Sequence, residues 1–447
     1  MTLSATRLIS GWGLFARPGR ELQSASLESA AAGAELSRGL GRSYGDSSLP
    51  ATAESVVLRT TEADRILRFD EATGHLTGEA GLPLHEIHRL LMPRGWFSPV
   101  TPGTQFVTLG GMVASDVHGK NHHREGCFGE HVTLLRMRLA SGEVVTCGPH
   151  EREDLFWATV GGMGLTGHIL EVTFRMVRIP SPWIYQESRR VPDIESFIAG
   201  LKESGPDWPM TMGWIDCVSG GSNLGRGILM RGRWAEPSEA PASFPKMPPR
   251  ITMPLFLPSW ALNPLSVRAF NTLYYWKHLA REKRGIVSPW GFFYPLDAIH
   301  LWNRMYGRRG FTQYQCVLPD AAGHGAARRF LELLVRLGGA SFLCVIKDCG
   351  AEGQGLLSFP QPGISIALDL PLRDWTQRVV DALNAFVIAE GGRIYLTKDT
   401  LTLPADFARM EPRLAAFDEV RRRYDPDRRL RSHQSVRLLD PATQELR

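Results

Sequence analysis

The sequence predicts an α+β protein with two regions of mixed strands and helices. Short β-branched runs separated by glycine-containing turns fill the chain up to Val177, and strand-like runs alternate with helical patterns from Tyr314 onwards. The string Arg178-Ile-Pro-Ser-Pro182 has the composition of a domain boundary. A chain of 447 residues has room for two or three domains of about 150 residues each.

The first region is predicted to contain hairpins and one helix. Turns at Thr73-Gly74 and Ser141-Gly142 each join two strand-like runs, as expected for hairpins. Between them, apolar residues at helical spacing from Leu84 to Leu91 predict an amphipathic helix that Pro93 ends. The predicted strands are Val56–Thr60, Ile66–Phe69, His75–Glu79, Leu134–Leu139, Val144–Thr146 and Ile169–Val177.

The second region is predicted to alternate strands with helices. A Pro-rich stretch from Pro237 to Pro264 leads into it as a long surface excursion. Helical patterns then cover Ala321–Leu337 and Asp374–Glu390, and a further helix is expected over Ala405–Tyr424. The predicted strands are Tyr314–Leu318, Phe342–Ile346, Ile364–Leu370 and Ile394–Thr397.

The segment Leu265–Arg284 mixes aromatic residues with basic ones. This pattern fits a helix that lies at a membrane interface. It also fits a helix that packs its aromatic side chains against its own domain, and the sequence leaves both interpretations open.

The composition is that of an ordinary globular protein, with 43% hydrophobic and 22% charged residues. The 51 Lys and Arg outnumber the 46 Asp and Glu by only five, and acids interrupt the Arg-rich patch at 421–431, so no nucleic-acid partner is expected. Six scattered cysteines without a CxxC pair suit a reducing compartment. No signal peptide or spanning helix is recognised, so we expect a cytoplasmic protein or one bound peripherally to the inner membrane.

Three loops rich in small residues, all before residue 125, are candidates for binding a phosphate-bearing ligand. In Gly39–Asp46 (GLGRSYGD), closely spaced glycines expose successive backbone N–H groups, and Arg42 adds charged donors. Pro102–Gly111 and Ser115–His123 are the other two loops, and we expect all three to line one extended site. The GxGxxG match at Gly162–Gly167 does not indicate a Rossmann loop, because a strand follows where a helix is needed.

No metal site is expected at the histidine cluster His118, His122 and His123 with Cys127. Gly119 disfavours the helix that would bring the first two histidines onto one face, and no acidic residue stands in ligand register.

These loops carry a resemblance to a known family. The chain resembles the FAD enzymes of the vanillyl-alcohol-oxidase and p-cresol-methylhydroxylase type and, within them, the oxidases of polyprenylphosphoryl ribose. Five segments carry the resemblance in family order over nearly the whole chain: Arg38–Asp46, Pro102–Gly111, His118–His123 (HGKNHH), Phe156–Gly167 and Gly391–Asp399.

The resemblance implies FAD as the cofactor and a two-domain p-cresol-methylhydroxylase-type FAD-binding fold. A discontinuous FAD-binding domain would comprise residues 1–181 and 393–447, with an α+β substrate domain at residues 182–392 between them. The implied cofactor-binding residues are Arg38, Gly39, Gly41, Arg42, Ser43, Tyr44, Gly45, Asp46, Gly103, Thr108, Leu109, Gly110, Gly111, Ser115, His118, Ile169 and Tyr395. The implied substrate-binding residues are Lys120, Trp214, Gln313, Lys347 and Ser365, and the implied catalytic residues are Lys398, Tyr44, Gln315 and His118.

Two positions depart from patterns in the family. Relatives that attach FAD covalently have His where this chain has Arg42, so we expect non-covalent FAD. Many mycobacterial relatives have Cys at the position of Ala367, the residue that covalent nitroaromatic inhibitors attack, so no such adduct is expected here. The family also varies at Ser365, so the lipid or the sugar could differ from the mycobacterial one.

The resemblance implies oxidation of the 2′-hydroxyl of a polyprenylphosphoryl-β-D-ribose to the 2′-keto sugar. This is the first half of an epimerisation that yields the arabinofuranose donor for the cell envelope. A short-chain NAD(P)H-dependent keto-reductase would act next in series, and the lipid tail implies peripheral contact with a membrane.

Oxidation of a secondary alcohol on a flavin needs a group that accepts the hydroxyl proton and a cation near the N1–C2=O end of the flavin ring. Lys398 is the candidate for both tasks. Two alternatives remain: an alditol or aldonolactone oxidase that acts on free sugars with oxygen, and a non-catalytic flavin-binding subunit.

Overall fold

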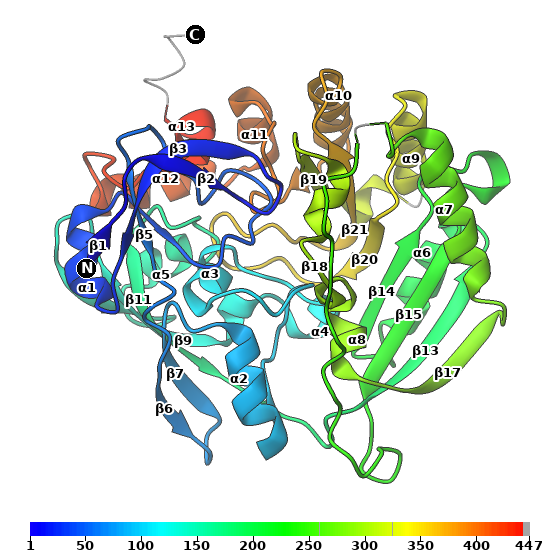
Figure 1. Cartoon of the computed structure of the whole chain (residues 1–447), viewed down its shortest axis with the longest axis horizontal. Helices are drawn as coiled ribbons and strands as arrows, with labels where there is room; N and C mark the ends of the chain where they lie inside the picture. The colour runs from blue at the N-terminus through cyan, green and yellow to red at the C-terminus, as the bar shows by residue number, and fades with distance from the viewer. Residues whose placement is uncertain (259, 324, 441–447) are drawn as a thin grey trace.

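The computed structural model describes residues 1–258, 260–323 and 325–440, and it mixes helices with strands along the whole chain (Figure 1). The protein is therefore α+β, as the sequence predicts. Small sheets built from residues before 180 lie on the left in Figure 1, and one large sheet built from later residues lies on the right. Helix α3 (Leu109–Ala114) lies between the two groups in this view.

The first small sheet places the Gly39–Asp46 loop. Strand β5 (Val56–Arg59), predicted from its β-branched run, pairs in parallel with β3 (Ala16–Gln23) and with β4 (Leu36–Arg38). The loop begins directly after β4. Two short strands, β1 (Thr2–Leu3) and β2 (Arg7–Ser10), also pair with β3, and none of β1 to β4 was predicted from the sequence.

The second small sheet confirms both predicted hairpins. Its antiparallel strand order is β10-β9-β11-β7-β6, so β11 joins the two hairpins by pairing with a strand of each. Helix α2 (Leu84–Leu91) is also confirmed and ends in a short 3₁₀ turn before Gly95. The strand bounds are β6 Ile66–Asp70, β7 His75–Glu79, β9 Val132–Arg138, β10 Val144–Cys147 and β11 His168–Arg175.

The large sheet has eight antiparallel strands in the order β17-β13-β15-β14-β20-β21-β19-β22. It includes the predicted strands of the second region, and β13, β14, β15 and β17 were not predicted. The bounds are β13 Ile184–Val191, β14 Met210–Ile215, β15 Gly227–Trp234, β17 Glu282–Val287, β19 Phe311–Pro319, β20 Cys344–Cys349, β21 Gly363–Pro371 and β22 Arg393–Ile394.

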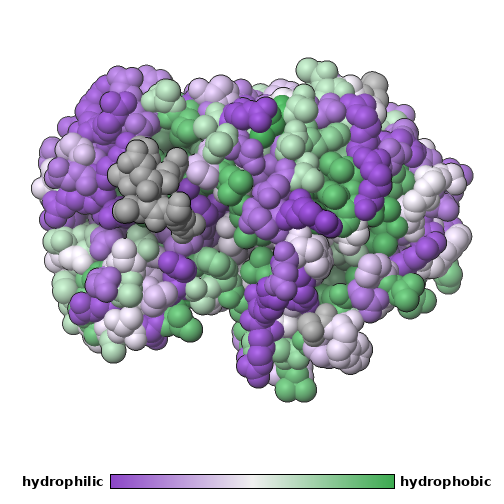
Figure 2. Space-filling model, turned by 90° about the horizontal axis from the view of Figure 1, so that it is seen from above, coloured by the Kyte–Doolittle hydropathy of each residue, from purple (hydrophilic) through white to green (hydrophobic). Residues whose placement is uncertain are grey.

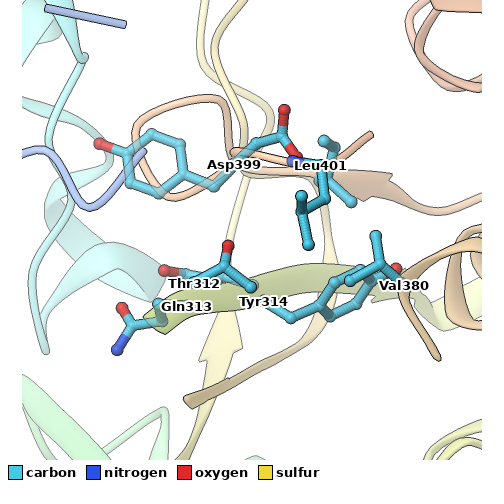
Figure 3. A pocket seen from close by; sticks show the side chains of 9 residues that line it. Thr312, Gln313, Tyr314, Val380, Asp399 and Leu401 are labelled. Carbon is cyan, nitrogen blue, oxygen red and sulfur yellow. The ribbon is translucent and has the colours of Figure 1, made fainter. Parts of the chain in front are cut away.

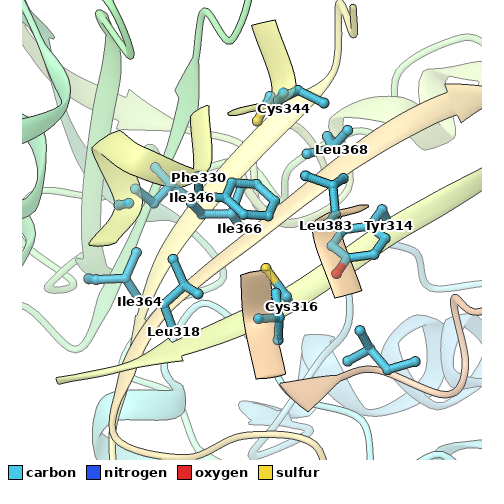
Figure 4. Close-up of a cluster of buried hydrophobic side chains, with 14 of the residues drawn as sticks. Tyr314, Cys316, Leu318, Phe330, Cys344, Ile346, Ile364, Ile366, Leu368 and Leu383 are labelled. Atoms are coloured by element: carbon cyan, nitrogen blue, oxygen red, sulfur yellow. The ribbon is translucent and has the colours of Figure 1, made fainter. Parts of the chain in front are cut away.

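Three helices cover one face of this sheet. Side chains from α6 (Ile194–Ser204), α9 (Ala326–Arg336) and α10 (Thr376–Ala389) form one buried cluster with alternate strand residues such as Cys316 and Ile366 (Figure 4). Because side chains alternate along a strand, the residues between them point to the opposite face. Helices α7 (Pro264–Lys277) and α8 (Pro289–Phe293) pack against part of that face, and another part of it borders a cavity.

Two predicted helices need correction. The segment Leu265–Arg284 is a helix only as α7 (Pro264–Lys277), and its basic end lies in strand β17. The helix expected over 405–424 is divided into α11 (Pro404–Met410) and α12 (Leu414–Tyr424), because Pro412 cannot continue a helix from the preceding turn. Helix α9 begins later than expected, and His324, within the predicted range, lies outside the described residues, as do 441–447.

The remaining elements are short. They comprise α1 (Leu27–Ala30), α4 (His122–Glu125), α5 (Glu153–Thr159), α8 (Pro289–Phe293) and α13 (His433–Leu438), with strands β8 (Trp96–Phe97), β12 (Val177–Arg178), β16 (Ile251–Thr252) and β18 (Ile299–His300). Among the helices of the described ranges, none has the length and apolar character needed to cross a bilayer.

Candidate active site

A cavity of about 690 Å³ lies between the glycine-rich loops and the face of the large sheet opposite α6, α9 and α10. All three predicted loops line it, together with Lys347, Tyr395 and Lys398. All but four of the predicted site residues are on its wall. The exceptions are Gly45, Asp46, Leu109 and Ser365.

These four residues lie behind the lining residues and contact them or neighbouring loops. A Cβ atom on Gly45 would lie 1.6 Å from the carbonyl oxygen of Asp399, so the two loops touch there. Leu109 is buried in the core, and Ser365 accepts a 3.2 Å hydrogen bond from Nε2 of Gln315. Asp46 is buried in an ion-pair cluster described below.

The Gly39–Asp46 loop forms a cradle of free backbone donors. Gly41 has φ of +64°, and a Cβ there would lie 2.1 Å from Nη2 of Arg38. Within the described residues, the N–H groups of 40–43 donate no hydrogen bond. Nη2 of Arg38 donates to the carbonyl oxygen of Ser10 at 2.7 Å, and this bond anchors the start of the loop. Successive free N–H groups of this kind bind phosphate oxygens, so the loop fits a pyrophosphate.

The Thr108–Gly111 segment, expected to bind the cofactor, uses two of its backbone N–H groups within the protein. The N–H of Leu109 donates to the carbonyl of Leu82, and that of Gly110 donates to the carbonyl of Ala80. These two amides are therefore not free for a ligand. A Cβ on Gly39 would lie 2.2 Å from Oγ1 of Thr108, so this string instead packs closely against the first loop.

Because side chains alternate along a strand, β19 presents polar side chains to the cavity and apolar ones to the helices. Gln313 and Gln315 line the cavity from β19, whereas Tyr314 between them is buried among the helices. Figure 3 shows the side chains of Gln313 and Tyr314 diverging from neighbouring positions of the strand. Trp214 of β14 lies on the same wall and donates from Nε1 to the carbonyl oxygen of Phe342 at 2.9 Å.

Three lysines from distant parts of the chain meet on this cavity. Burial, together with the smaller effect of the charge on Lys347, lowers the pKa of Lys120 to about 7. Burial likewise lowers the pKa of Lys347. Burial also lowers the pKa of Lys398 to about 7, against the opposing charge of Asp369. Each lysine therefore holds its proton less firmly than a surface lysine does.

Asp369 is a site residue that the sequence analysis missed. It accepts hydrogen bonds from the hydroxyl of Tyr306 at 2.7 Å and from Nε2 of Gln313 at 2.6 Å. Burial raises the pKa of its carboxyl group to about 6, against the effect of these two bonds. Asp369 thus fixes Gln313, and its charge raises the pKa of Lys398.

His118 is held as a neutral imidazole. Burial moves its pKa well below the usual value, and Lys347 adds to this. Nε2 of Gln315 donates to Nε2 of His118 at 3.1 Å, because an amide nitrogen can only donate. The ring lies beside Tyr395, whose hydroxyl donates to the carbonyl of Ser115 at 2.7 Å.

An ion-pair cluster joins the first loop to the loop that carries Lys398. Arg437 of α13 donates from Nη2 to Asp46 and to Asp399, both at 2.8 Å. Nδ1 of His433 lies 2.6 Å from Asp46. Burial would raise the pKa of Asp46, but Arg437 and His433 hold it below its usual value. No local sequence signal points to Arg437, because its partners lie far away in the chain.

Two further residues of the cavity wall, Trp12 and Asp297, were not predicted from the sequence. The guanidinium carbon of Arg42 lies 4.2 Å from the centroid of the Trp12 ring. Asp297 accepts a hydrogen bond from Oγ1 of Thr104 at 2.7 Å. Burial lowers the pKa of Arg42, and the charge of Asp297 opposes this. Among the described residues, no group of three or more His, Cys, Asp or Glu side chains is arranged to hold a metal ion.

Comparison with known proteins agrees with this geometry. A family model described as an FAD binding domain matches residues 18–148, which contain all three loops. The chain is 34% identical over 416 residues to decaprenylphosphoryl-beta-D-ribose oxidase of Mycolicibacterium smegmatis, covering 90% of this chain and 88% of that protein. The chain belongs to the decaprenylphosphoryl-β-D-ribose oxidase family.

Other relatives are less similar to this chain. An uncharacterised protein of Streptomyces coelicolor is 31% identical over 77% of this chain and 96% of its own length. A putative D-arabinono-1,4-lactone oxidase of Neurospora crassa is 32% identical, but over only 26% of this chain and 20% of its own. The likeness to lactone oxidases is therefore confined to a part of the chain.

Membership of the family establishes the cofactor and the enzyme class. This protein is an FAD-dependent oxidoreductase that acts on a CH–OH group. The free N–H groups at 40–43 and the cations around the cavity are the features of this structure that fit FAD and a phosphorylated substrate.

Proposed function

We propose that this protein oxidises the 2′-hydroxyl of a polyprenylphosphoryl-β-D-ribose to the 2′-keto sugar. The single observation that carries the proposal is the 34% identity over 90% of the chain to an oxidase of that substrate class. The convergence of three lysines and two glutamines on one cavity supports it, because a sugar phosphate needs cations and hydroxyl-binding amides.

The proposed binding site divides between cofactor and substrate. The Gly39–Asp46 loop and Gly103 hold the pyrophosphate and ribityl chain of FAD, with Ser115, Ile169 and Tyr395 along the ring. The FAD domain comprises residues 1–181 and 393–447, and the substrate domain comprises 182–392 in a p-cresol-methylhydroxylase-type arrangement. FAD is bound without a covalent link, because Arg42 replaces the histidine that other relatives use.

The proposed chemistry assigns a role to each polar side chain. Bound FAD supplies the acceptor for the hydride that leaves the carbinol carbon. Lys398, with its pKa lowered to about 7, takes the hydroxyl proton as a neutral amine. Gln315 and Tyr44 orient the sugar hydroxyls, and His118 holds Gln315 in place. Lys120 and Lys347 face the phosphate.

The proposal also includes the partners that such a substrate requires. A keto sugar must be reduced with inverted stereochemistry to yield arabinose, so a short-chain NAD(P)H-dependent keto-reductase acts in series. The polyprenyl tail stays in a bilayer, so the protein makes peripheral contact with a membrane.

Anaerobic bleaching of the bound flavin tests the substrate class. A polyprenylphosphoryl ribose, an alditol and an aldonolactone are added in parallel to the holoenzyme. We expect bleaching by the lipid-linked ribose alone. Bleaching by a free sugar only would overturn the proposal and move the protein to the alditol or lactone oxidases.

A further inference from the structure

The largest gathering of exposed apolar side chains lies within residues 244–279. Ten of the nineteen large hydrophobic residues that the described part of the chain exposes are in this stretch. Monomeric soluble proteins rarely expose apolar residues so densely unless they bind something there. The ten are Phe244, Met247, Ile251, Leu255, Trp260, Leu265, Phe270, Leu273, Trp276 and Leu279.

One side of helix α7 holds it to the protein through the buried residues Val267, Asn271 and Tyr275, and Tyr275 packs in a cluster with Trp214 and Ile228. Nδ2 of Asn271 donates to Asp216 at 2.9 Å, and Oγ1 of Thr272 accepts from Arg226 at 3.0 Å. Arg226 also lies 4.9 Å from the centroid of the Tyr275 ring. Leu265, by contrast, is 80% exposed. Leu273 and Trp276 are also more than half exposed, so α7 presents a second apolar surface on its outer side, beyond the one that packs against its own domain.

Residues 251–258 lie beside the wall of the cavity. Strand β16 pairs in parallel with β18, and the amide of Leu257 donates to the carbonyl of Arg304 at 3.1 Å. Both β18 and α7 contribute to the cavity wall, through Ile299, His300, Phe270 and Tyr274. Of the exposed apolar residues, Phe270 lines the cavity itself, and Ile251 pairs with Ile299 on its wall. Hydrophobic side chains are exposed on the right half of Figure 2, the side where Figure 1 places α7.

The charge of this surface identifies its partner. Residues 244–284 contain seven Lys and Arg but a single acid, Glu282. Lys246, Arg268 and Lys277 form no ion pair within the described ranges. Apolar side chains and tryptophans bordered by unpaired cations match a bilayer with anionic headgroups.

We propose that α7 and residues 244–258 form a docking surface for an anionic bilayer, and that the lipid tail of the substrate enters the cavity between α7 and β18. The tail passes Phe270 and Tyr274 on its way in, so the sugar reaches Lys398 while the rest of the tail stays in the bilayer. The tail route rests on the proposed function. The docking surface stands on exposure and charge alone.

Vesicle sedimentation of the holoenzyme tests the docking surface without any substrate. We expect the protein to bind vesicles of phosphatidylglycerol and phosphatidylcholine at low salt, and to bind at least tenfold less to phosphatidylcholine alone. The variants Leu265→Ser/Leu273→Ser and Ile251→Ser/Leu255→Ser should each weaken binding at least tenfold. Leu8→Ser is the matched control, because Leu8 is 73% exposed on β2 and should leave binding unchanged.

Retained flavin absorbance shows that each variant is folded, and two variants on separate segments guard against a local folding defect. Failure of the wild-type protein to bind anionic vesicles would overturn the docking surface. So would equal effects of Leu8→Ser and the two double variants, or a dimer in solution that only the double variants dissociate.

Substrate length tests the tail route. The double variants should turn over a short-chain polyprenylphosphoryl ribose in solution at the wild-type rate, but lose at least tenfold activity on the long-chain substrate in vesicles. Equal activity on both would overturn the tail route. No turnover of either substrate by the wild-type enzyme would refute the proposed function and leave the vesicle result standing.

Discussion

The ammonium nitrogen of Lys398 lies 3.7 Å from the centroid of the Tyr44 ring, although the two residues come from opposite ends of the chain. The ring face favours the charged form of the lysine, and so does Asp369 nearby. Burial opposes both and brings the pKa to about 7. Lys398 is therefore divided between its charged and neutral forms near pH 7, which lets one residue stabilise negative charge and also accept a proton.

Replacement of Lys398 tests this assignment. Lys398→Ala should lower the rate of flavin reduction by the lipid-linked ribose by at least about 10²-fold, the usual contribution of a general base. The flavin should remain bound, because the cradle at 40–43 is unchanged. Anaerobic stopped-flow absorbance measures both. Lys202→Ala, which removes a lysine paired with Asp320 and Asp348, should behave as wild type. Reduction of Lys398→Ala at the wild-type rate would refute the role.

The pH dependence of flavin reduction should report the titration of Lys398. A proton acceptor works in its neutral form, so the rate should rise with pH through an apparent pKa of about 7. Asp369 raises this pKa, so Asp369→Asn should move the profile to lower pH by up to about one unit. Asp374→Asn removes an exposed acid and should leave the profile in place. A shift of the Asp369→Asn profile to higher pH would contradict this electrostatic account.

Arg437 is expected to position the two loops that hold Tyr44 and Lys398. Arg437→Met leaves Asp46 buried without its main partner, so it should lower the free energy of unfolding by about 3–5 kcal/mol. Arg437→Lys should restore part of the loss. Arg328→Met breaks an exposed pair with Glu195 and should cost about 1 kcal/mol or less. Denaturant unfolding of the holoenzyme measures all three, and equal losses for Arg437→Met and Arg328→Met would rule out a positioning cluster.

The flavin should dissociate on acid denaturation. Arg42 stacks on Trp12 where covalent relatives have a histidine nucleophile, and a guanidinium forms no bond to the flavin. After precipitation with trichloroacetic acid, the yellow colour is expected in the supernatant. Flavin that stays in the washed pellet would disprove the non-covalent assignment.

Ala367 should make the enzyme resistant to covalent labelling by nitroaromatic inhibitors. It lines the cavity on β21, whereas Cys316 and Cys344 are buried on the helix-covered face of the sheet. Intact-mass measurement after turnover with the inhibitor should show no adduct on the wild-type chain and one adduct on Ala367→Cys. An adduct on the wild-type protein would mean that another cysteine is reachable.

Local patterns were enough to predict much of the fold. The turns at Thr73-Gly74 and Ser141-Gly142 predicted both hairpins, because hairpins depend on neighbours in the chain. The prediction of one helix over 405–424 was wrong at Pro412. It followed the helical spacing of the apolar residues and ignored the proline, which divides the segment into two helices. The prediction of a helix over 265–284 was wrong beyond Lys277, because β17 pairs there with the distant strand β13.

The sequence by itself determined the glycine-rich loops, the family and most of the residues that line the cavity, because these depend on strings of adjacent residues. Only the tertiary structure decided that Leu109 and Gly110 use their amides internally, that Asp369 is the acid beside Lys398, and that Arg437 joins two loops. It also decided which face of α7 is exposed. Those features depend on burial and on contacts between residues far apart in the chain, and neither leaves a local pattern in the sequence.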